Sequence, residues 1–147
     1  MLAAAALAAG GAGATRARDA NSPPDARSAG YLIIVNPESR VRELGRSFVR
    51  AAFLKKAATW ADGATIRPVD LPRVSPVRER FTREVLNKTP AQLRAYWNQQ
   101  IFSGKGVPPP EVDSDAAMIA YVLHHQGAMG YLPLSVDPRG AVVVTLR

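Results

Sequence analysis

The segment Tyr31-Leu32-Ile33-Ile34-Val35 is a continuous apolar run, rich in β-branched residues, that stops at Asn36-Pro37. Such a run is typical of a strand covered on both faces, as in sheets that have helices on either side. Segments with helical spacing follow it, and further strand-like runs occur near the carboxyl end. The segment therefore predicts an α/β fold that begins near residue 31.

Four downstream segments carry the signals of helices. Two of them open with a hydroxyl residue followed by proline, which is a capping residue before the first helical position. The apolar residues of all four recur at helical spacing. The predicted helices are Ser39–Lys56, one opened by Ser75-Pro76 with Phe81 on its apolar face, one opened by Thr89-Pro90 with Trp97, and one capped at Asp113 or Ser114 with Met118 and Val122.

Three more segments read as strands. Thr65–Asp70 contains Pro68, and proline confines a strand to the edge or end of a sheet. Ala128–Leu132 and Ala141–Leu146 are apolar runs near the end of the chain. Together with the first strand they predict a small mixed sheet with flanking helices, and hence the fold class α/β.

Composition fits a folded domain and excludes several functions. The chain has 147 residues, of which 47% are hydrophobic and 21% charged, which suits one hydrophobic core. Cysteine is absent, so disulfides and thiolate chemistry are excluded. The net charge is +7, but the arginines are scattered and often stand beside acids, without the basic run or aromatic pattern of a nucleic-acid interface. We interpret this charge as a solvated surface, with no nucleic-acid partner.

The amino-terminal region divides into two parts. Residues 1–14 are alanine-rich and end in Ala12-Gly13-Ala14, which predicts a signal peptide and hence a periplasmic or secreted protein. Residues 15–30 are polar and contain a Pro-Pro pair, which is typical of a flexible linker. The third part, residues 31–147, is the predicted folded domain.

No catalytic or metal-binding pattern is found in the sequence. His124 and His125 are adjacent, so they cannot bind one metal from successive helical turns, and we expect them to lie at a helix end. Ser103-Gly104-Lys105-Gly106 lacks the spacing of a nucleotide-binding loop and predicts a flexible connection. We therefore expect no enzyme activity, no cofactor and no metal.

The start of the helix at Ser75 is the one candidate ligand site, formed by Ser75, Val77 and Arg78. Amides in the first turn of a helix point outward without partners and favour an anion. Ser75 would add a hydroxyl, and Arg78 a guanidinium that matches phosphate or carboxylate. In the alternative interpretation, which ranks ahead on the residues alone, Ser75 only caps the helix and Arg78 pairs with Glu79 or Asp70.

Four segments together resemble the phosphate-type periplasmic substrate-binding family. They are Leu32-Ile33-Ile34-Val35-Asn36-Pro37, Phe53-Leu54-Lys55-Lys56 with Trp60, Ser75 before Phe81, and Gly127-Ala128-Met129-Gly130-Tyr131. The resemblance covers residues 31–131 and implies a type 2 periplasmic binding fold, of which this chain is similar to one lobe. The family's anion-contacting serine falls on Ser75, whereas its following glycine and threonine fall on Pro76 and Val77.

The resemblance implies a binding protein rather than an enzyme. The first hypothesis is an exported module that weakly recognises phosphate or another small oxyanion, linked to ABC-type phosphate transport or sensing. Its partners would be the oxyanion and a membrane component of an ABC transporter or another periplasmic protein. The alternative is a scaffold that binds a protein partner through Arg73, Arg78, Lys105 and the loop Pro108-Pro109-Pro110.

Overall fold

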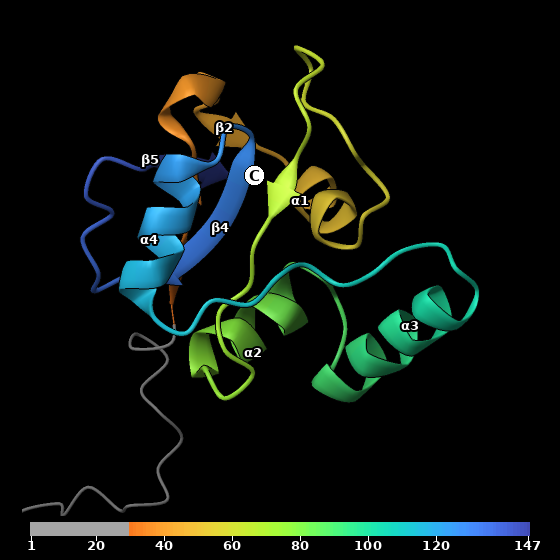
Figure 1. Ribbon diagram of the computed structural model, residues 1–147. Helices are drawn as coiled ribbons and strands as arrows, with labels where there is room; N and C mark the ends of the chain where they lie inside the picture. Colours follow the sequence, from red (N-terminus) through yellow and green to blue (C-terminus); the bar gives the residue numbers. More distant parts are fainter. Residues whose placement is uncertain (1–29) are drawn as a thin grey trace, which may run out of the picture.

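The computed structural model describes residues 30–147 (Figure 1). The predicted signal peptide and nearly all of the predicted linker lie outside the described residues. In the described part, one five-stranded sheet is accompanied by four α-helices and a short 3-10 helix. The elements in chain order are β1 (Tyr31–Val35), η1 (Pro37–Ser39), β2 (Glu43–Leu44), α1 (Arg46–Phe53), β3 (Arg67–Pro68), α2 (Pro76–Glu84), α3 (Pro90–Phe102), α4 (Asp115–His124), β4 (Ala128–Pro133) and β5 (Val142–Leu146).

The sheet is mixed, as the sequence predicts, with the strand order β2-β5-β1-β4-β3. The first strand, β1, is central and pairs antiparallel with β4 on one side and β5 on the other. The two-residue strands β2 and β3 lie at the edges, each parallel to its neighbour. The edge position predicted for the strand that contains Pro68 is therefore confirmed.

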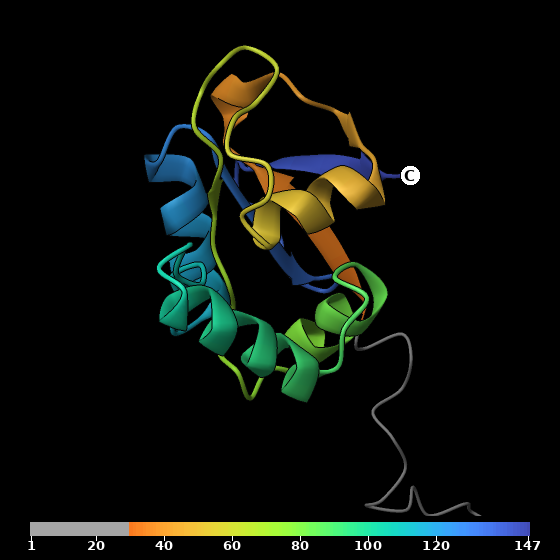
Figure 2. The same cartoon turned by 90° about the vertical axis from the view of Figure 1, so that its right-hand side faces the viewer.

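Helices cover both faces of the sheet, which explains the unbroken apolar run of β1 (Figures 1 and 2). Successive residues of β4 show the two faces. The side chain of Tyr131 packs against Phe53 of α1 and Phe81 of α2, and its ring stacks on Phe81 with centroids 4.1 Å apart. Gly130 faces the other way, towards Met118 of α4. The buried core thus has a layer on each side of the sheet.

Two glycines of the Gly127-Ala128-Met129-Gly130-Tyr131 segment allow this packing. Gly127 has a φ of +81°, and a Cβ atom there would collide with the backbone carbonyl of Thr65. A Cβ atom on Gly130 would collide with the sulfur of Met118. The motif therefore has a packing role, because it brings β4 close to both β3 and α4.

Two predicted elements are wrong in extent. The predicted helix Ser39–Lys56 begins only at Arg46, because Arg40 has a left-handed φ of 56° and Glu43–Leu44 pairs with β5 as a strand. The predicted strand Thr65–Asp70 is reduced to Arg67–Pro68, with single bridges at Thr65 and Asp70. Proline has no N–H to donate, and this limits the ladder of hydrogen bonds at this edge.

The two proline-started helices are confirmed. Ser75 caps α2 and Thr89 caps α3, where the side chain of Gln92 completes a capping box. Ser114, one of two residues expected to cap the last helix, is the N-cap of α4. The predicted core residues Phe81 and Trp97 are buried. No helix among residues 30–147 is both long enough and apolar enough to span a bilayer.

Candidate functional site

The start of α2 brings Ser75, Val77 and Arg78 together, because they are its N-cap and two residues of its first turn. The Ser75 Oγ accepts a hydrogen bond from the backbone amide of Arg78 at 3.3 Å, so this hydroxyl acts as the helix cap. Pro76 contributes no N–H, and the side chain of Val77 is buried. In the described part of the chain, the amide of Val77 has no hydrogen-bond partner. One first-turn donor therefore remains for an anion.

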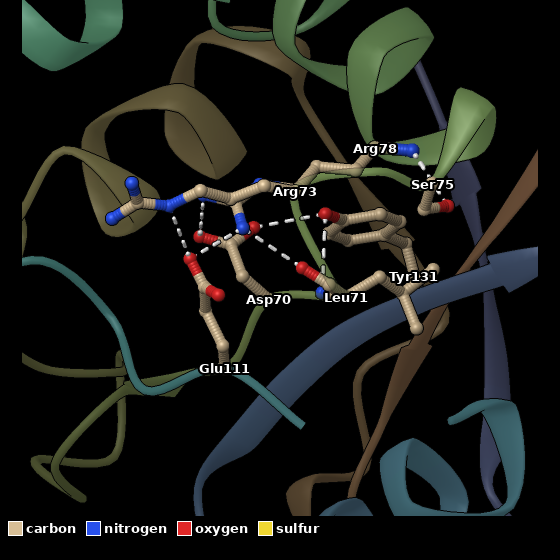
Figure 3. Close-up of polar contacts among 7 residues, drawn as sticks. All are labelled: Asp70, Leu71, Arg73, Ser75, Arg78, Glu111 and Tyr131. Atoms are coloured by element: carbon tan, nitrogen blue, oxygen red, sulfur yellow. Dashed lines mark hydrogen bonds and ion pairs between the residues drawn. The ribbon is translucent and has the colours of Figure 1, made fainter. Parts of the chain in front are cut away.

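The side chain of Arg78 turns away from this helix start and into a polar cluster (Figure 3). Its Nη1 donates hydrogen bonds to the carbonyl of Leu71 at 2.9 Å and to the Glu111 carboxylate at 2.6 Å. Its Nη2 lies 3.7 Å from a carboxylate oxygen of Asp70. Only 13% of the Arg78 side chain is exposed. The guanidinium is thus fixed by two hydrogen bonds and one ion pair.

Asp70 is the buried acid of this cluster, with 7% of its side chain exposed. Its Oδ1 accepts a hydrogen bond from the Tyr131 hydroxyl at 2.9 Å, and that hydroxyl accepts one from the amide of Leu71. Burial raises the pKa of Asp70 to about 6, although the charge of Arg78 and the hydrogen bond from Tyr131 act in the opposite direction. Burial also raises the pKa of Tyr131, and the carboxylate of Asp70 raises it further.

Glu111 reaches the cluster from the segment that connects α3 to α4. This segment runs alongside Asp70, whose amide donates to the carbonyl of Pro110 and whose carbonyl accepts from the amide of Val112. Glu111 accepts hydrogen bonds from both Arg78 and Arg73. Partial burial would raise the pKa of Glu111, but these two arginines lower it below its ordinary value. Glu111 is therefore held as a carboxylate.

The four charged side chains of the cluster balance one another. Arg73 and Arg78 supply two positive charges, and Asp70 and Glu111 supply two negative charges when both are ionised. The inner pair, Asp70 and Arg78, is largely buried, whereas Glu111 and Arg73 reach the surface. An external anion that approached Arg78 would meet the carboxylate of Glu111 already bound there. An external oxyanion would therefore have to compete with Glu111 for the two arginines, of which only Arg73 is well exposed.

Of the two acids that the sequence suggests as partners of Arg78, the structure confirms one. Asp70 lies beside Arg78, so this partner from the alternative interpretation is confirmed. Glu79 is not a partner of Arg78, because it pairs with Arg83 one helical turn later. Sequence reasoning missed Glu111, which is 33 residues from Arg78 in the chain. It also missed the role of the Tyr131 hydroxyl, although Tyr131 belongs to a recognised motif. An arginine in the first turn of a helix was the available signal that compensating acids lie nearby.

The histidines lie where the sequence predicts, at the end of a helix. His124 is the last residue of α4, and His125 follows it as the C-cap, with its ring stacked on Tyr121. The Nδ1 of His125 lies 2.9 Å from the carbonyl oxygen of Tyr121. These contacts give His125 a structural role. Among residues 30–147 there is no group of three acidic or histidine side chains placed to hold a metal ion.

The fold matches solved structures of proteins connected with phosphate transport. An ABC-type phosphate transport receptor from Vibrio cholerae is 19% identical to this chain with a TM-score of 0.62, and PstS from Borrelia burgdorferi is 13% identical with a TM-score of 0.62. Each match covers 80% of this chain, but 46% and 47% of the respective receptors. In fold, the chain therefore matches one lobe of a periplasmic-binding-protein-like architecture.

The level of identity limits what the match shows to the fold, and this fold agrees with the resemblance in the sequence. A further match, to a Clostridium perfringens protein described as a phosphate ABC transporter substrate-binding protein with bound phosphate, covers 80% of this chain and 44% of that one. The chain thus spans less than half the length of these structures. No protein-family model and no curated protein sequence matches the chain.

Proposed function

We propose that this chain is a PstS-like substrate-binding module that weakly binds phosphate or another small oxyanion at the start of α2. It binds without covalent chemistry, and it works outside the cytoplasm alongside a membrane component of an ABC transporter. The fold match supports the substrate-binding class. The module would be exported through residues 1–14. Intact mass of the protein from its native host tests the export, and full-length chain in the cytosol would contradict it.

One observation carries the oxyanion proposal: two arginines at the start of α2 already hold the carboxylate of Glu111 (Figure 3). A carboxylate and a phosphate offer similar oxygen acceptors to a guanidinium. The partly exposed Glu111 therefore acts as an internal competitor for Arg73 and Arg78. The hydroxyl of Ser75 and the free amide of Val77 belong to the same helix start, but the side chain of Arg78 turns away from them, so the proposal rests on the two arginines.

The competition makes Glu111→Gln the decisive variant. This change removes the internal anion but keeps the size of the side chain, so phosphate should bind the variant at least ten-fold more tightly than the parent chain. Affinity in the parent should be no tighter than micromolar to millimolar and should fall as salt screens the charges. Isothermal titration with phosphate, sulfate and acetate measures these affinities.

A matched control is Glu84→Gln, which removes an exposed acid that pairs with Arg80 of the same helix. Both variants raise the net charge by one, so a general electrostatic effect would strengthen binding equally in the two. Equal binding by the two variants, or no binding of any of these anions to Glu111→Gln at millimolar concentration, would contradict the oxyanion proposal.

The second candidate function is a protein-interaction module of the same fold. It is favoured by the buried pairing of Arg78 with Asp70 and by large apolar side chains that are open to solvent near the same helices. Phe102 at the end of α3 is 95% exposed, and Val74 before α2 is 92% exposed. A photo-reactive amino acid at position 102 tests this candidate in the native host. The absence of a specific cross-linked partner, with phosphate binding intact, would rule it out.

A further inference from the structure

A cavity of about 230 Å³ lies between α2, α3 and the segment that returns from α3 towards α4. Figure 2 shows α2 and α3 side by side at this end of the molecule. The walls include apolar side chains from α3, namely Leu93, Trp97 and Ile101, and the ring of Pro108 from the returning segment. The cavity is smaller than the 300–1,000 Å³ typical of sites for drug-sized ligands. A compact apolar group is the size of guest that this space suits.

Polar groups of the cavity wall remain unused by the protein. Thr82 of α2 is only 3% exposed, yet its hydroxyl has no hydrogen-bond partner among residues 30–147. The indole N–H of Trp97 likewise lacks a partner within the described part of the chain. Neither polar atom is sealed from solvent, because no fully buried side-chain nitrogen or oxygen in this part of the chain is left unsatisfied. Water therefore satisfies both groups in the empty cavity, and a ligand that displaces this water must replace its hydrogen bonds.

The charges at the cavity favour an anion. Arg94, on the exposed side of α3, has no ion pair or hydrogen bond within residues 30–147. The two acids of the wall are already engaged, Glu79 by Arg83 and Glu111 by Arg78 and Arg73. The unused groups therefore include a guanidinium, an indole N–H and a hydroxyl, all of which can donate a hydrogen bond. The exposed amide of Asn98, which can donate and accept, is unused as well among residues 30–147. A ligand that satisfies them must present acceptors and a negative charge.

We propose that this cavity binds a small carboxylate with a compact apolar tail, aromatic or branched. The carboxylate contacts Arg94 and the hydroxyl of Thr82, and the tail packs against Trp97, Leu93 and Ile101. This site adjoins the proposed oxyanion contact, because Arg73, Arg78 and Glu111 also line the cavity. It differs in the groups that hold the ligand, which are Arg94 and the hydroxyl of Thr82. It needs an apolar tail, which phosphate lacks.

Phenylacetate is a suitable probe. Two comparison ligands are acetate, which lacks the apolar tail, and phenylacetamide, which lacks the negative charge. The readout is the ¹H–¹⁵N signal of the Trp97 indole, which is told apart from that of Trp60 by a Trp97→Phe variant. Phenylacetate should shift this signal saturably, with a Kd between roughly 0.1 and 5 mM for so small a ligand. Acetate and phenylacetamide should bind at least ten-fold more weakly.

Three variants locate the ligand. Arg94→Gln should weaken phenylacetate binding by about ten-fold, and Thr82→Val, which keeps the shape of the side chain, by several-fold. Arg67→Gln is the matched control, because it removes an exposed arginine of β3 that lies outside the cavity and should leave the affinity unchanged. Phosphate titrated into Glu111→Gln reports separately on the oxyanion proposal.

The proposal is overturned if the Trp97 signal does not saturate with phenylacetate up to 20 mM. It is also overturned if Arg94→Gln and Arg67→Gln lose the same affinity, which would indicate attraction by net charge alone. Equal affinity for phenylacetate and phenylacetamide would contradict the role of the carboxylate in the same way.

Discussion

Replacing Arg78 by methionine tests the buried cluster most directly, because it removes the cation and largely keeps the volume. The variant leaves the carboxylate of Asp70 without its positive partner and the carbonyl of Leu71 without a donor. Removing one partner of a buried ion pair typically costs about 3–5 kcal/mol. We expect a loss of this size at pH 8, which is a large share of the 5–15 kcal/mol that ordinarily stabilises a domain.

The pH dependence of this loss follows from the pKa of Asp70. Its value in the folded protein is about 6, against a reference value of 3.8. Because the pKa of Asp70 is higher in the folded protein than in the unfolded chain, Asp70 contributes its full stabilisation below about pH 4. This contribution declines as the pH rises towards 6, and above that pH it is lost. Without the charge of Arg78, the pKa of Asp70 rises further, so the decline continues above pH 6 in the variant. The gap in unfolding free energy between the two proteins should therefore widen above pH 6 by about 1.4 kcal/mol per pH unit until Asp70 ionises in the variant.

Urea denaturation at pH 5, 6, 7 and 8, followed by circular dichroism, measures this gap. Arg83→Met is the matched control, because Arg83 lies on the same helix but pairs with Glu79 at the surface. An exposed pair of this kind contributes about 0–1 kcal/mol, so the control should be little destabilised at any of these pH values. The account of the cluster is refuted if Arg78→Met is as stable as this control. It is refuted as well if the gap between Arg78→Met and the parent is constant from pH 5 to pH 8.

Three further changes test the packing of the fold by thermal and urea denaturation. Phe81→Ala should cost about 3–5 kcal/mol, because it removes a fully buried ring stacked on Tyr131, and an unchanged midpoint would refute the packing. Gly127→Ala should cost about 2–5 kcal/mol, since a Cβ atom there needs a left-handed φ and collides with Thr65; a variant as stable as the parent would refute this. Ser75→Ala should cost about 1 kcal/mol through the lost cap, at any phosphate concentration below that needed for binding, and no loss would show that the cap is dispensable.

The elements that the sequence predicted well are those with local signals. The strand β1 is a short apolar run bounded by proline, and α2 and α3 open with a capping residue and proline. These signals act within a few residues of the chain, so they do not depend on the rest of the fold. The position of Pro68 at an edge follows from its missing N–H in the same way.

The misplaced elements and the missed site residues depend on distant contacts. Leu44 fits a helical pattern, but the pairing of β2 with β5, about a hundred residues later, makes it part of a strand. Glu111 lies in a segment without regular structure, and only the return of that segment past Asp70 brings it to Arg78. The sequence identifies Arg78 as a cation in need of compensation, but tertiary structure alone decides which acid provides it.

The central position of β1 affects when the sheet can form during synthesis of the chain. Both of its neighbours, β4 and β5, come from the last twenty residues, and every pairing joins positions about a hundred residues apart. While the chain is being synthesised, β1 has neither partner until β4 and β5 have left the ribosome, about a hundred residues after β1. Sheets built from such distant contacts close slowly, because the entropy of a large loop is lost before the strands are joined. The nascent chain consequently passes through a long period without its sheet, during which chaperones have access to an unfolded polypeptide.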